Sequence, residues 1–416
     1  MFDYDKWQEI FGTIRKNKLR TFLTVLGIFW GIFMIIILLG AGNSFREGVS
    51  QGFSSWTTNS GFVWGQRTTI SHQGFQPGKY VRFDNSDTKL LWSRIHELRY
   101  LAPRNSLGRN NTVIYKEKSG QFEVLGDYPD FNKIQIQDFK NGRFINQLDI
   151  DNGRKVAVIG PNVNKILFGD VEDPIGEYIS IRKINFKVIG VIDSTNTGGD
   201  TRRLNNVHLP FTTFQKAFNF GDNVGWYAYS VEDGVNVEES ETRIIELLKN
   251  RNNIHPLDED AIGHFNLQEE FDEINGLFDG LKYFTWFVGL STLFAGIIGV
   301  SNIMLIIVKE RTKEIGIRKS LGATPFSIVS LILQESIFLT LVGGYMALVT
   351  GLLLLDGIAK AMPPQSPEMP FAPPTVNPAI AFGALGILVI GGMIAGILPA
   401  KRAASISPVE AIRTEG

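Results

Sequence analysis

Four long apolar stretches interrupt an otherwise polar chain. A helix needs about 20 mainly apolar residues to cross the roughly 30 Å hydrocarbon core of a bilayer. Each stretch meets that length, and the only charged residues within the four are Lys282 and Glu335. The pattern therefore predicts four transmembrane α-helices, at residues 21–41, 281–308, 326–355 and 378–400.

Lysine and arginine gather beside these spans on one side. They precede the first span, recur through residues 309–325 and follow the fourth span, whereas the loop 356–377 holds only Lys360. Because cytoplasmic flanks carry the excess of basic residues, the pattern predicts that both termini and residues 309–325 face the cytoplasm. Residues 42–280 and the loop 356–377, which is short and rich in proline, are then expected outside.

The first 20 residues carry a helical stripe of apolar side chains flanked by basic ones. Trp7, Ile10, Phe11 and Ile14 recur at helical spacing, which predicts an amphipathic helix along the inner bilayer surface. A cleaved signal peptide is the competing interpretation of the N-terminus. The length of the apolar run and the lack of an A-x-A-like site after it favour a retained span.

The segment 42–280 alternates short strand patterns with helical ones, which predicts a large mixed α/β domain. Helices are expected at 86–100 and 238–249. Strands are expected at 60–70, 111–115, 155–159, 178–181, 185–192 and 227–231, with a further extended piece from Ile254. The strands between about 140 and 210 cluster together, so we expect a β-rich lobe inserted into another lobe. The predicted order ends with a cytoplasmic tail at 401–416.

Charge and composition narrow the function. Lys and Arg total 41 against 42 Asp and Glu, a net charge of -1. Nucleic-acid binding requires clustered basic residues, so no nucleic-acid partner is expected. The chain has no cysteine, which excludes disulfides and thiolate chemistry.

The sequence has no phosphate-binding loop of the form G-x-x-x-x-G-K-[ST]. The nearest match, Gly78-Lys79, is followed by Tyr80 instead of a hydroxyl residue, and Gln73 replaces the first glycine. The five histidines lack metal-ligand spacing, the carboxylates at 269–273 fit a solvated helix face, and no G-x-S-x-G elbow occurs. No catalytic, cofactor-binding or metal site is expected here, and ATP with magnesium is expected on a partner ATPase.

Glu335 is an ionisable residue inside a predicted span, where it should face protein or water because exposure to lipid is costly. An inter-helix hydrogen bond or snorkelling is favoured over a proton relay, since Glu335 lies only a few turns from the cytoplasmic end. Glycines are frequent in the second and third spans. Small residues allow helices to approach closely, which suggests packing against a second subunit.

Residues 309–325 predict a short charged helix between two spans. Glu310 with Lys313, and Glu314 with Arg318, can pair on its surface. Gly322 then supplies a turn, and Pro325 opens the next helix where its missing N–H does no harm. A loop anchored only by positive charge is the alternative, but a loop would not need this helical pattern.

This stretch, KERTKEIGIRKSLGATPFSIVSLILQ at 309–334, closely resembles the coupling-helix region of the MacB-like permeases, the FtsX-type (type VII, mechanotransmission) branch of ABC transporters. The tail GILPAKRAA at 396–404, followed by SPVEAI, is similar to the same family's ending. The segments 156–160, 167–176 and 186–191 are similar to its periplasmic core domain. The founding efflux pump carries its nucleotide-binding domain on the same polypeptide, whereas this chain begins directly at the amphipathic helix.

The resemblance implies a permease in the bacterial inner membrane with a periplasmic domain made of a porter-like lobe and an inserted sabre-like lobe. It also implies that two such subunits form a homodimer, in which each subunit docks a cytoplasmic ABC ATPase beneath its coupling helix. Glu314, Ile315, Gly316 and Arg318 are expected to form the surface that meets the ATPase. The residues assigned to the coupling helix are Arg311, Glu314, Ile315, Gly316, Arg318, Lys319, Leu321 and Gly322.

The resemblance is less direct evidence for the substrate that the protein moves. The resemblance implies efflux from the periplasm through an adaptor and an outer-membrane TolC-like duct. Lipoprotein release, and regulation of a cell-wall hydrolase, are alternatives within the family that share the same stroke. A membrane receptor with an extracytoplasmic sensor domain is the alternative from another class. The absence of a cytoplasmic effector domain and the presence of the coupling-helix motif disfavour it.

Overall fold

The computed structural model describes residues 18–169, 173–193, 201–362, 371–374 and 378–407. The predicted amphipathic helix at 1–20 lies almost entirely outside these residues, as does the end of the cytoplasmic tail. The chain forms two compact units. Among the described residues, the helical unit comprises 18–47, 277–362, 371–374 and 378–407, and the α/β unit comprises 48–169, 173–193 and 201–276.

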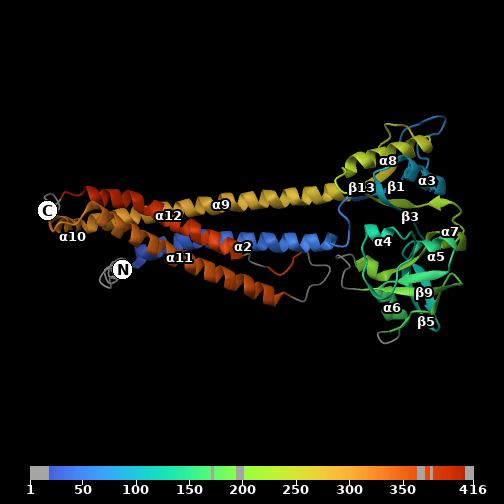
Figure 1. Ribbon diagram of the computed structural model, residues 1–416, viewed down its shortest axis with the longest axis horizontal. Coiled ribbons are helices and arrows are strands. Elements are labelled where there is room, and N and C mark those ends of the chain that lie inside the picture. The colour runs from blue at the N-terminus through green and yellow to red at the C-terminus, as the bar shows by residue number, and fades with distance from the viewer. Residues whose placement is uncertain (1–17, 170–172, 194–200, 363–370, 375–377, 408–416) are drawn as a thin grey trace. The chain divides into compact units, whose positions relative to one another are not determined.

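The helical unit is built from long helices, labelled in Figure 1. They are α2 (Lys18–Phe53), α9 (Leu267–Glu310), α11 (Pro325–Ala361) and α12 (Pro378–Ser405), with the short α10 (Thr312–Ser320) between α9 and α11. Within the described part of the chain, α2, α9 and α11 are long and apolar enough to cross a membrane. A helix, α12, also forms where the fourth span is expected, and its role as a span stays a prediction.

Two of these helices run well past the predicted ends of their spans. α2 has 36 residues and α9 has 44, about 54 Å and 66 Å at 1.5 Å per residue. A bilayer core is only about 30 Å thick. The polar first turns of α9 include the carboxylates at 269–273, in agreement with the predicted helical face. Both helices contribute residues to each of the two units.

Glycine allows α2 to approach its neighbours within the same chain. A Cβ atom at Gly289 of α9 would lie 2.2 Å from Ile35, and one at Gly343 of α11 would lie 3.0 Å from the carbonyl oxygen of Val25. Both distances are too short for ordinary contact. Within this chain, Gly289 and Gly343 therefore pack against α2, and packing of the glycines against a second subunit stays a prediction.

The α/β unit holds a mixed sheet. One part of it pairs β13 (Ile262–Asn266), β1 (Ser60–Gly65), β12 (Trp226–Val231) and β3 (Leu98–Ser106) in antiparallel order. A second part contains β4 (Asn111–Tyr115), β5 (Lys118–Asp127), β6 (Phe139–Gly142), β7 (Val156–Ile159), β8 (Tyr178–Ile181), β9 (Ile184–Ile192) and β10 (Asn206–Pro210). β2 (Phe83–Asp84) and β11 (Asn223–Val224) form a separate pair.

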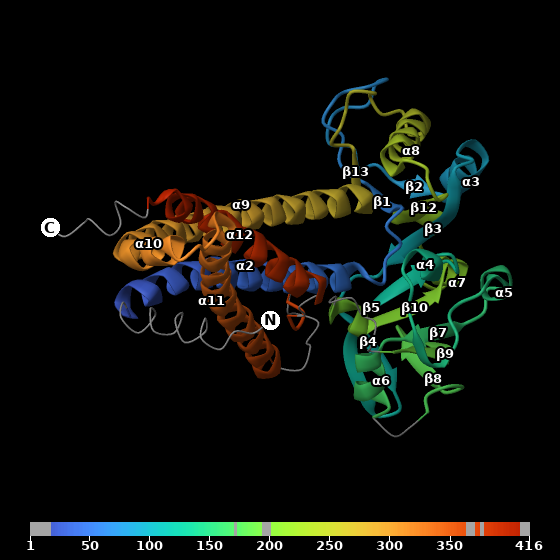
Figure 2. The same cartoon turned by 60° about the vertical axis from the view of Figure 1, so that its left-hand side comes forward.

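Short helices surround these strands, as Figure 2 shows. They are α3 (Asn85–Arg94), α4 (Phe131–Ile134), α5 (Gln147–Asp151), α6 (Pro161–Leu167), the 3-10 turn η1 (Thr201–Asn205), α7 (Phe211–Ala217) and α8 (Val237–Arg251). Two hydrophobic clusters fill the unit. One lies under α3 and α8, and the other is enclosed by β4, β5 and β7–β10 with α6 and α7.

The second cluster extends beyond the lobe expected at 140–210. It begins with Val113 on β4 and ends with Phe214 on α7. The reason is strand pairing, because β4 pairs with β8 and β5 pairs with β10. Local strand patterns cannot reveal those long-range partners.

Two other expectations need correction. The helix expected at 86–100 ends at Arg94, and Leu98 begins β3 instead, which pairs with β12. The extended piece expected from Ile254 is a turn region, and β13 starts only at Ile262. The start of α3 is fixed by a capping box in which the side chains of Asp84 and Asp87 each accept from the other's backbone N–H.

The last residues of α2 and the first residues of α9 belong to the α/β unit. β13 ends at Asn266, whose side chain accepts from the backbone N–H of Gln268 at 3.0 Å and so caps the first turn of α9. After α2, the Ser55 carbonyl accepts from Ile136 N at 2.7 Å. The guanidinium of Arg203, on η1, donates to the Ser55 hydroxyl at 2.6 Å. Ser55 and Arg203 are both buried, so the residues that follow α2 are held within the α/β unit.

Candidate functional site: the short helix between α9 and α11

The chain breaks direction between α9 and α10 at a single residue, Arg311. Its backbone has φ of -96° and ψ of 14°, outside the helical range. The hydroxyl of Thr312 donates to the carbonyl oxygens of Val308 and Lys309, at 3.2 and 2.8 Å. These bonds satisfy acceptors that the end of α9 leaves open.

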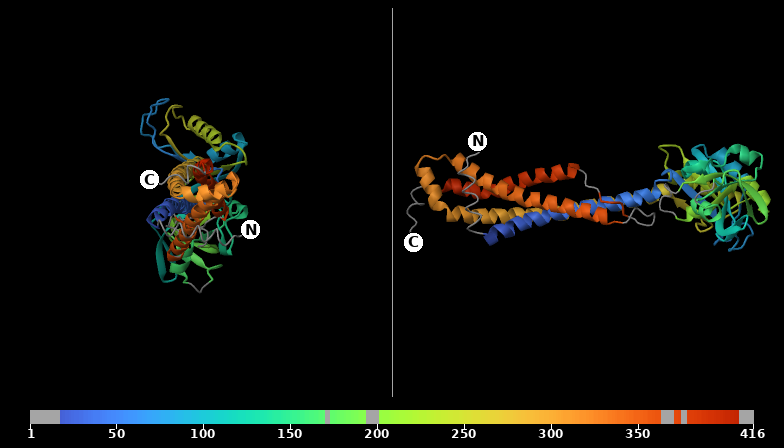
Figure 3. Two further views of the ribbon diagram at one scale, coloured as in Figure 1. Left: turned by 90° about the vertical axis from the view of Figure 1, so that its left-hand side faces the viewer. Right: turned by 90° about the horizontal axis from the view of Figure 1, so that it is seen from below.

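The C-terminal end of α10 and the start of α11 follow the predicted turn. Gly322 has a φ of +95°, a conformation that glycine adopts without strain. Thr324 then caps α11, since its side chain accepts from Ser327 N at 3.3 Å, and Pro325 occupies the first turn. Figure 3 shows α10 as the short connection at one end of the helical unit.

One face of α10 is seated on the helical unit by residues spaced four apart. Arg311, Ile315 and Lys319 lie at i, i+4 and i+8, which places them on one helix face. Ile315 is buried among residues of α9, α11 and α12. The Lys319 amine donates to the carbonyl oxygens of Ala404 and Ile406, each at 2.7 Å. Cations are favourable beside such C-terminal carbonyls.

Arg311 also reaches Glu335 of α11. Its Nη1 atom lies 3.5 Å from Oε2 of Glu335, and the two side chains are 15% and 2% exposed. Arg311 Nε is 4.0 Å from Glu314 as well, whose side chain is 62% exposed. This ion pair joins α11 to the residue that precedes α10, and the hydrogen bond or snorkelling favoured from the sequence stays a prediction.

The opposite face of α10 points outward. Glu314 and Arg318 are exposed, and Leu321 is 84% exposed. Two further apolar residues, Ile317 at 45% and Phe326 at 79%, are exposed beside them. Neither residue was assigned to the coupling helix from the sequence. The signal that could have pointed to Phe326 is its large apolar side chain directly after Pro325.

The expected ATPase surface therefore needs correction. Ile315 and Gly316 are both buried in the helical unit, so they do not lie on the exposed surface with Glu314 and Arg318. The reason is the seating of α10, which turns one face of the helix toward α11 and α12. Of the assigned residues, Arg311, Ile315, Gly316 and Lys319 belong to the seat, whereas Glu314, Arg318, Leu321 and Gly322 are exposed.

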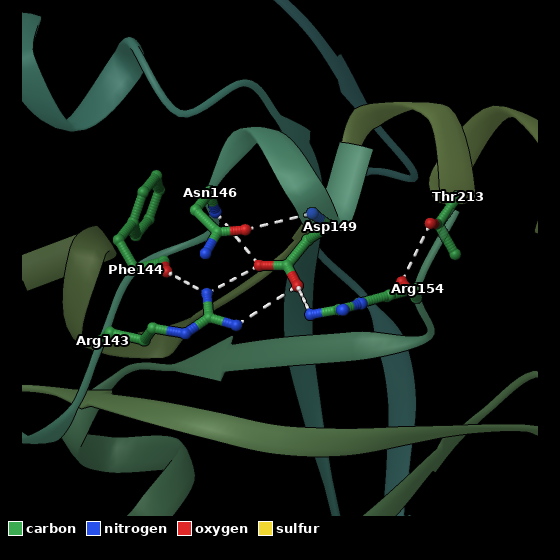
Figure 4. Close-up of polar contacts among 6 residues, drawn as sticks. All are labelled: Arg143, Phe144, Asn146, Asp149, Arg154 and Thr213. Carbon is green, nitrogen blue, oxygen red and sulfur yellow. Dashed lines mark hydrogen bonds and ion pairs between the residues drawn. The ribbon is translucent and has the colours of Figure 1, made fainter. Parts of the chain in front are cut away.

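The α/β unit holds polar clusters of a structural kind. Within the described ranges, no group of three or more His, Cys, Asp or Glu side chains is arranged to hold a metal ion. Figure 4 shows one cluster, where Asp149 accepts from Arg143 at 2.6 and 3.2 Å and from Arg154 at 3.4 Å. Asp149 also caps α5 together with Asn146.

These contacts explain the electrostatics of Asp149. Burial alone would raise the pKa of its carboxyl, but the bonds from Arg143, Asn146 and Arg154 outweigh burial and lower the pKa. A carboxylate held in this way stays ionised and has no free oxygen for acid or base chemistry. The cluster therefore connects α5 to the segments on either side of it, through Arg143 before the helix and Arg154 just before β7.

Apolar helices of this length, together with an α/β unit of this size, define a membrane protein with a large water-exposed domain. Two families match the chain. The MacB-like periplasmic core domain matches residues 21–247, more than half of the chain, and the FtsX-like permease C-terminal region matches residues 286–408. The chain belongs to the MacB-like, FtsX-type permeases of ABC transporters.

Relatives match nearly the whole chain. It is 28% identical over 407 residues to the "Macrolide export ATP-binding/permease protein MacB" of Bdellovibrio bacteriovorus, covering 97% of this chain and 61% of that protein. It is 29% identical over 403 residues to the "Pyoverdine export ATP-binding/permease protein PvdT" of Pseudomonas entomophila, covering 96% and 58%. The chain thus spans about three fifths of the length of these curated relatives.

A solved structure is also similar. The periplasmic region of MacB from Actinobacillus actinomycetemcomitans matches with 21% identity and a TM-score of 0.43, covering 54% of this chain and 95% of that one.

Proposed function

We propose that the chain is the permease subunit of an ABC exporter in the bacterial inner membrane, and that it passes an ATP-driven movement from a cytoplasmic ATPase to its periplasmic α/β unit. The observation that carries the proposal is the division of α10 into a seated face and an exposed face. A short helix fixed to three long helices, with apolar residues left exposed, is suited to receive force from a partner.

The exposed face supplies the docking surface. Leu321 and Phe326 have large apolar side chains that the rest of the described chain leaves uncovered, and covering apolar groups of this kind with a partner is favourable. Glu314 and Arg318 flank them and offer opposite charges that orient a partner. We define these four residues with Ile317 as the docking face.

The long helices supply the route for the movement. α10 is tied to α11 by Arg311 and to α12 by Lys319, and α9 leads directly into it. At its other end, α9 begins where β13 ends, with no linker residue between them. A displacement of α10 would therefore pass along α9 into the strand that precedes it.

The export role rests on the relatives. These relatives are named as macrolide and pyoverdine export proteins that combine an ATP-binding part with a permease. For this chain we propose two direct protein partners: a cytoplasmic ABC ATPase that holds ATP and magnesium, and a second permease subunit. Membrane lipid surrounds the helices, and a periplasmic adaptor with an outer-membrane TolC-like duct completes the proposed assembly. Substrate would move outward from the periplasm.

The docking face can be tested by substitution of Leu321 and Phe326 with aspartate in the full chain, expressed with its cognate ATPase. Both side chains are exposed, so the membrane fold should persist while ATPase co-purification falls at least tenfold. Leu257→Asp is the matched control, because Leu257 is 76% exposed in the α/β unit. Equal co-purification of the double variant and the wild type would overturn the proposal.

Gly316 is unsuitable for this experiment. A bulky residue there would disturb the buried contact of α10 with its own chain, so lost association would not separate misfolding from lost docking. Export itself can be tested in a strain that lacks the chain. Increased sensitivity to exported compounds supports efflux, whereas lipoproteins retained in the inner membrane would favour the lipoprotein-releasing alternative.

A further inference from the structure

The break between α9 and α10 leaves the orientation of α10 to be set by side chains. Arg311 sits at the break with a non-helical backbone, although its N–H still donates to the Ile307 carbonyl at 2.9 Å and its carbonyl accepts from Ile315 N at 3.0 Å. A docking helix transmits force only if its direction is fixed. Side chains at the N-terminal end of α10 therefore add to what the backbone fixes at the break.

We propose that Arg311 and Glu335 are positioning residues, and that the contact between them sets the orientation of α10 on α11. This inference rests on the proposed function of α10. The two side chains come from positions 24 residues apart, and their charged atoms lie 3.5 Å apart at a site where Glu335 is 2% exposed. Neither residue belongs to the docking face, so their role is distinct from contact with the ATPase.

Burial makes this contact more effective than an exposed ion pair. A buried carboxylate that loses its partner is strongly unfavourable, so α10 has little freedom to leave Glu335. The second carboxylate near Arg311, that of Glu314, is 4.0 Å away and mostly exposed, and solvent weakens its hold. Glu335 is therefore the partner that determines where Arg311 lies.

The other end of α10 is held independently. Lys319 binds the carbonyl oxygens of Ala404 and Ile406 at the end of α12. Loss of the Arg311–Glu335 contact should thus free only the N-terminal half of α10. The helix would pivot about Lys319, and the docking face would remain intact but poorly directed.

The experiment measures the orientation of α10 without an ATPase. The chain has no cysteine, so Lys313→Cys on α10 and Lys401→Cys on α12, both exposed, can carry a pair of spin labels in the full chain. We expect a single narrow distance distribution in the parent. Arg311→Met and Glu335→Met should each broaden it, and the charge-swapped variant R311E/E335R should restore it.

The double variant R311M/E335M guards against misfolding, because it removes the buried carboxylate together with the guanidinium beside it. It should fold and still show the broad distribution. Lys360→Met is the control, since it breaks an exposed pair with Asp356 on α11 and should leave the distribution unchanged. A narrow distribution in R311M/E335M would overturn the proposal.

The coupling readout separates this inference from the proposed function. R311M/E335M should co-purify with the cognate ATPase in normal amounts. The stimulation of ATP hydrolysis by the permease should, however, fall at least tenfold. Normal stimulation would also overturn the positioning role. If α10 is mispositioned in the label experiment but the docking-face variant still binds ATPase normally, the proposed function fails while the positioning role stands.

Discussion

Asp127 and His208 lie 2.6 Å apart, between Oδ2 and Nδ1, in the interior of the α/β unit. The other oxygen of Asp127 accepts from the Nε–H of Arg104, whose guanidinium lies 3.5 Å from the centre of the Phe131 ring. These three polar residues come from β5, β10 and β3. They join the strands of one hydrophobic cluster to those of the other.

Asparagine at position 127 should destabilise the α/β unit strongly. Burial alone would raise the pKa of Asp127, but Arg104 and His208 outweigh burial and hold the pKa below its ordinary value. Removing the charge leaves Arg104 buried without its partner, which costs about 3–5 kcal/mol. Urea unfolding of the full chain should show the loss, and Asp233→Asn, at an exposed pair with Arg99, should change little.

The same residue predicts acid sensitivity. Because the folded state holds the pKa of Asp127 below its value in the unfolded chain, the folded state binds fewer protons. The stabilisation is therefore complete above the ordinary carboxyl pKa of about 3.9 and is lost as pH falls through the lower, folded pKa. A wild-type urea midpoint that falls no faster than that of Asp127→Asn over this range would contradict the assignment.

Glu241 predicts the opposite dependence. It is buried on α8, 3.3 Å from His264, and burial is the main reason that its pKa is raised. The folded state binds the proton more tightly, so this contribution to stability is present below the ordinary glutamate pKa and is lost as pH rises through the raised pKa. Glutamine cannot ionise, so Glu241→Gln should remove the loss of stability that ionisation of Glu241 causes. The urea midpoint of the variant should therefore exceed that of the wild type near neutral pH, and the two midpoints should converge at lower pH.

The orientation of the chain can be tested with single cysteines. Asp151 and Lys313 are both exposed, so each replacement should leave the fold intact. An impermeant thiol reagent applied to intact cells should label Asp151→Cys and spare Lys313→Cys until the membrane is opened. The reverse pattern would contradict the topology drawn from the positive-inside rule.

Periodicity predicted most long elements, because the apolar spans and the strands with alternating burial carry a local signal. It failed at Leu98, which continues the helical stripe of Leu91 and Ile95 yet begins a strand. The pairing of β3 with β12, more than a hundred residues later, decides that boundary. Local spacing contains no information about that partner.

The same limit explains the result at α10. The sequence predicted the helix, its turn at Gly322 and its restart at Pro325. It did not predict which face points inward, because apolar residues at 315, 317 and 321 surround the helix. The seated face contacts Glu335 on α11 and the end of α12, and both partners are distant in sequence.

Lys319 leads to the final prediction. Its amine binds two carbonyl oxygens at the end of α12, and a hydrogen bond to a charged group contributes about 1.5–3 kcal/mol at buried sites. Because Lys319 is only half-buried, we expect Lys319→Met to lower the free energy of unfolding of the helical unit by about 1–2 kcal/mol. Ala403 is fully buried beside this contact, and a cysteine there provides the measurement. Lys319→Met should raise the rate at which Ala403→Cys reacts with a thiol reagent, whereas the control Lys313→Met, at an exposed site on the same helix, should leave that rate unchanged. Equal rates in both variants would mean that α12 is held by packing alone.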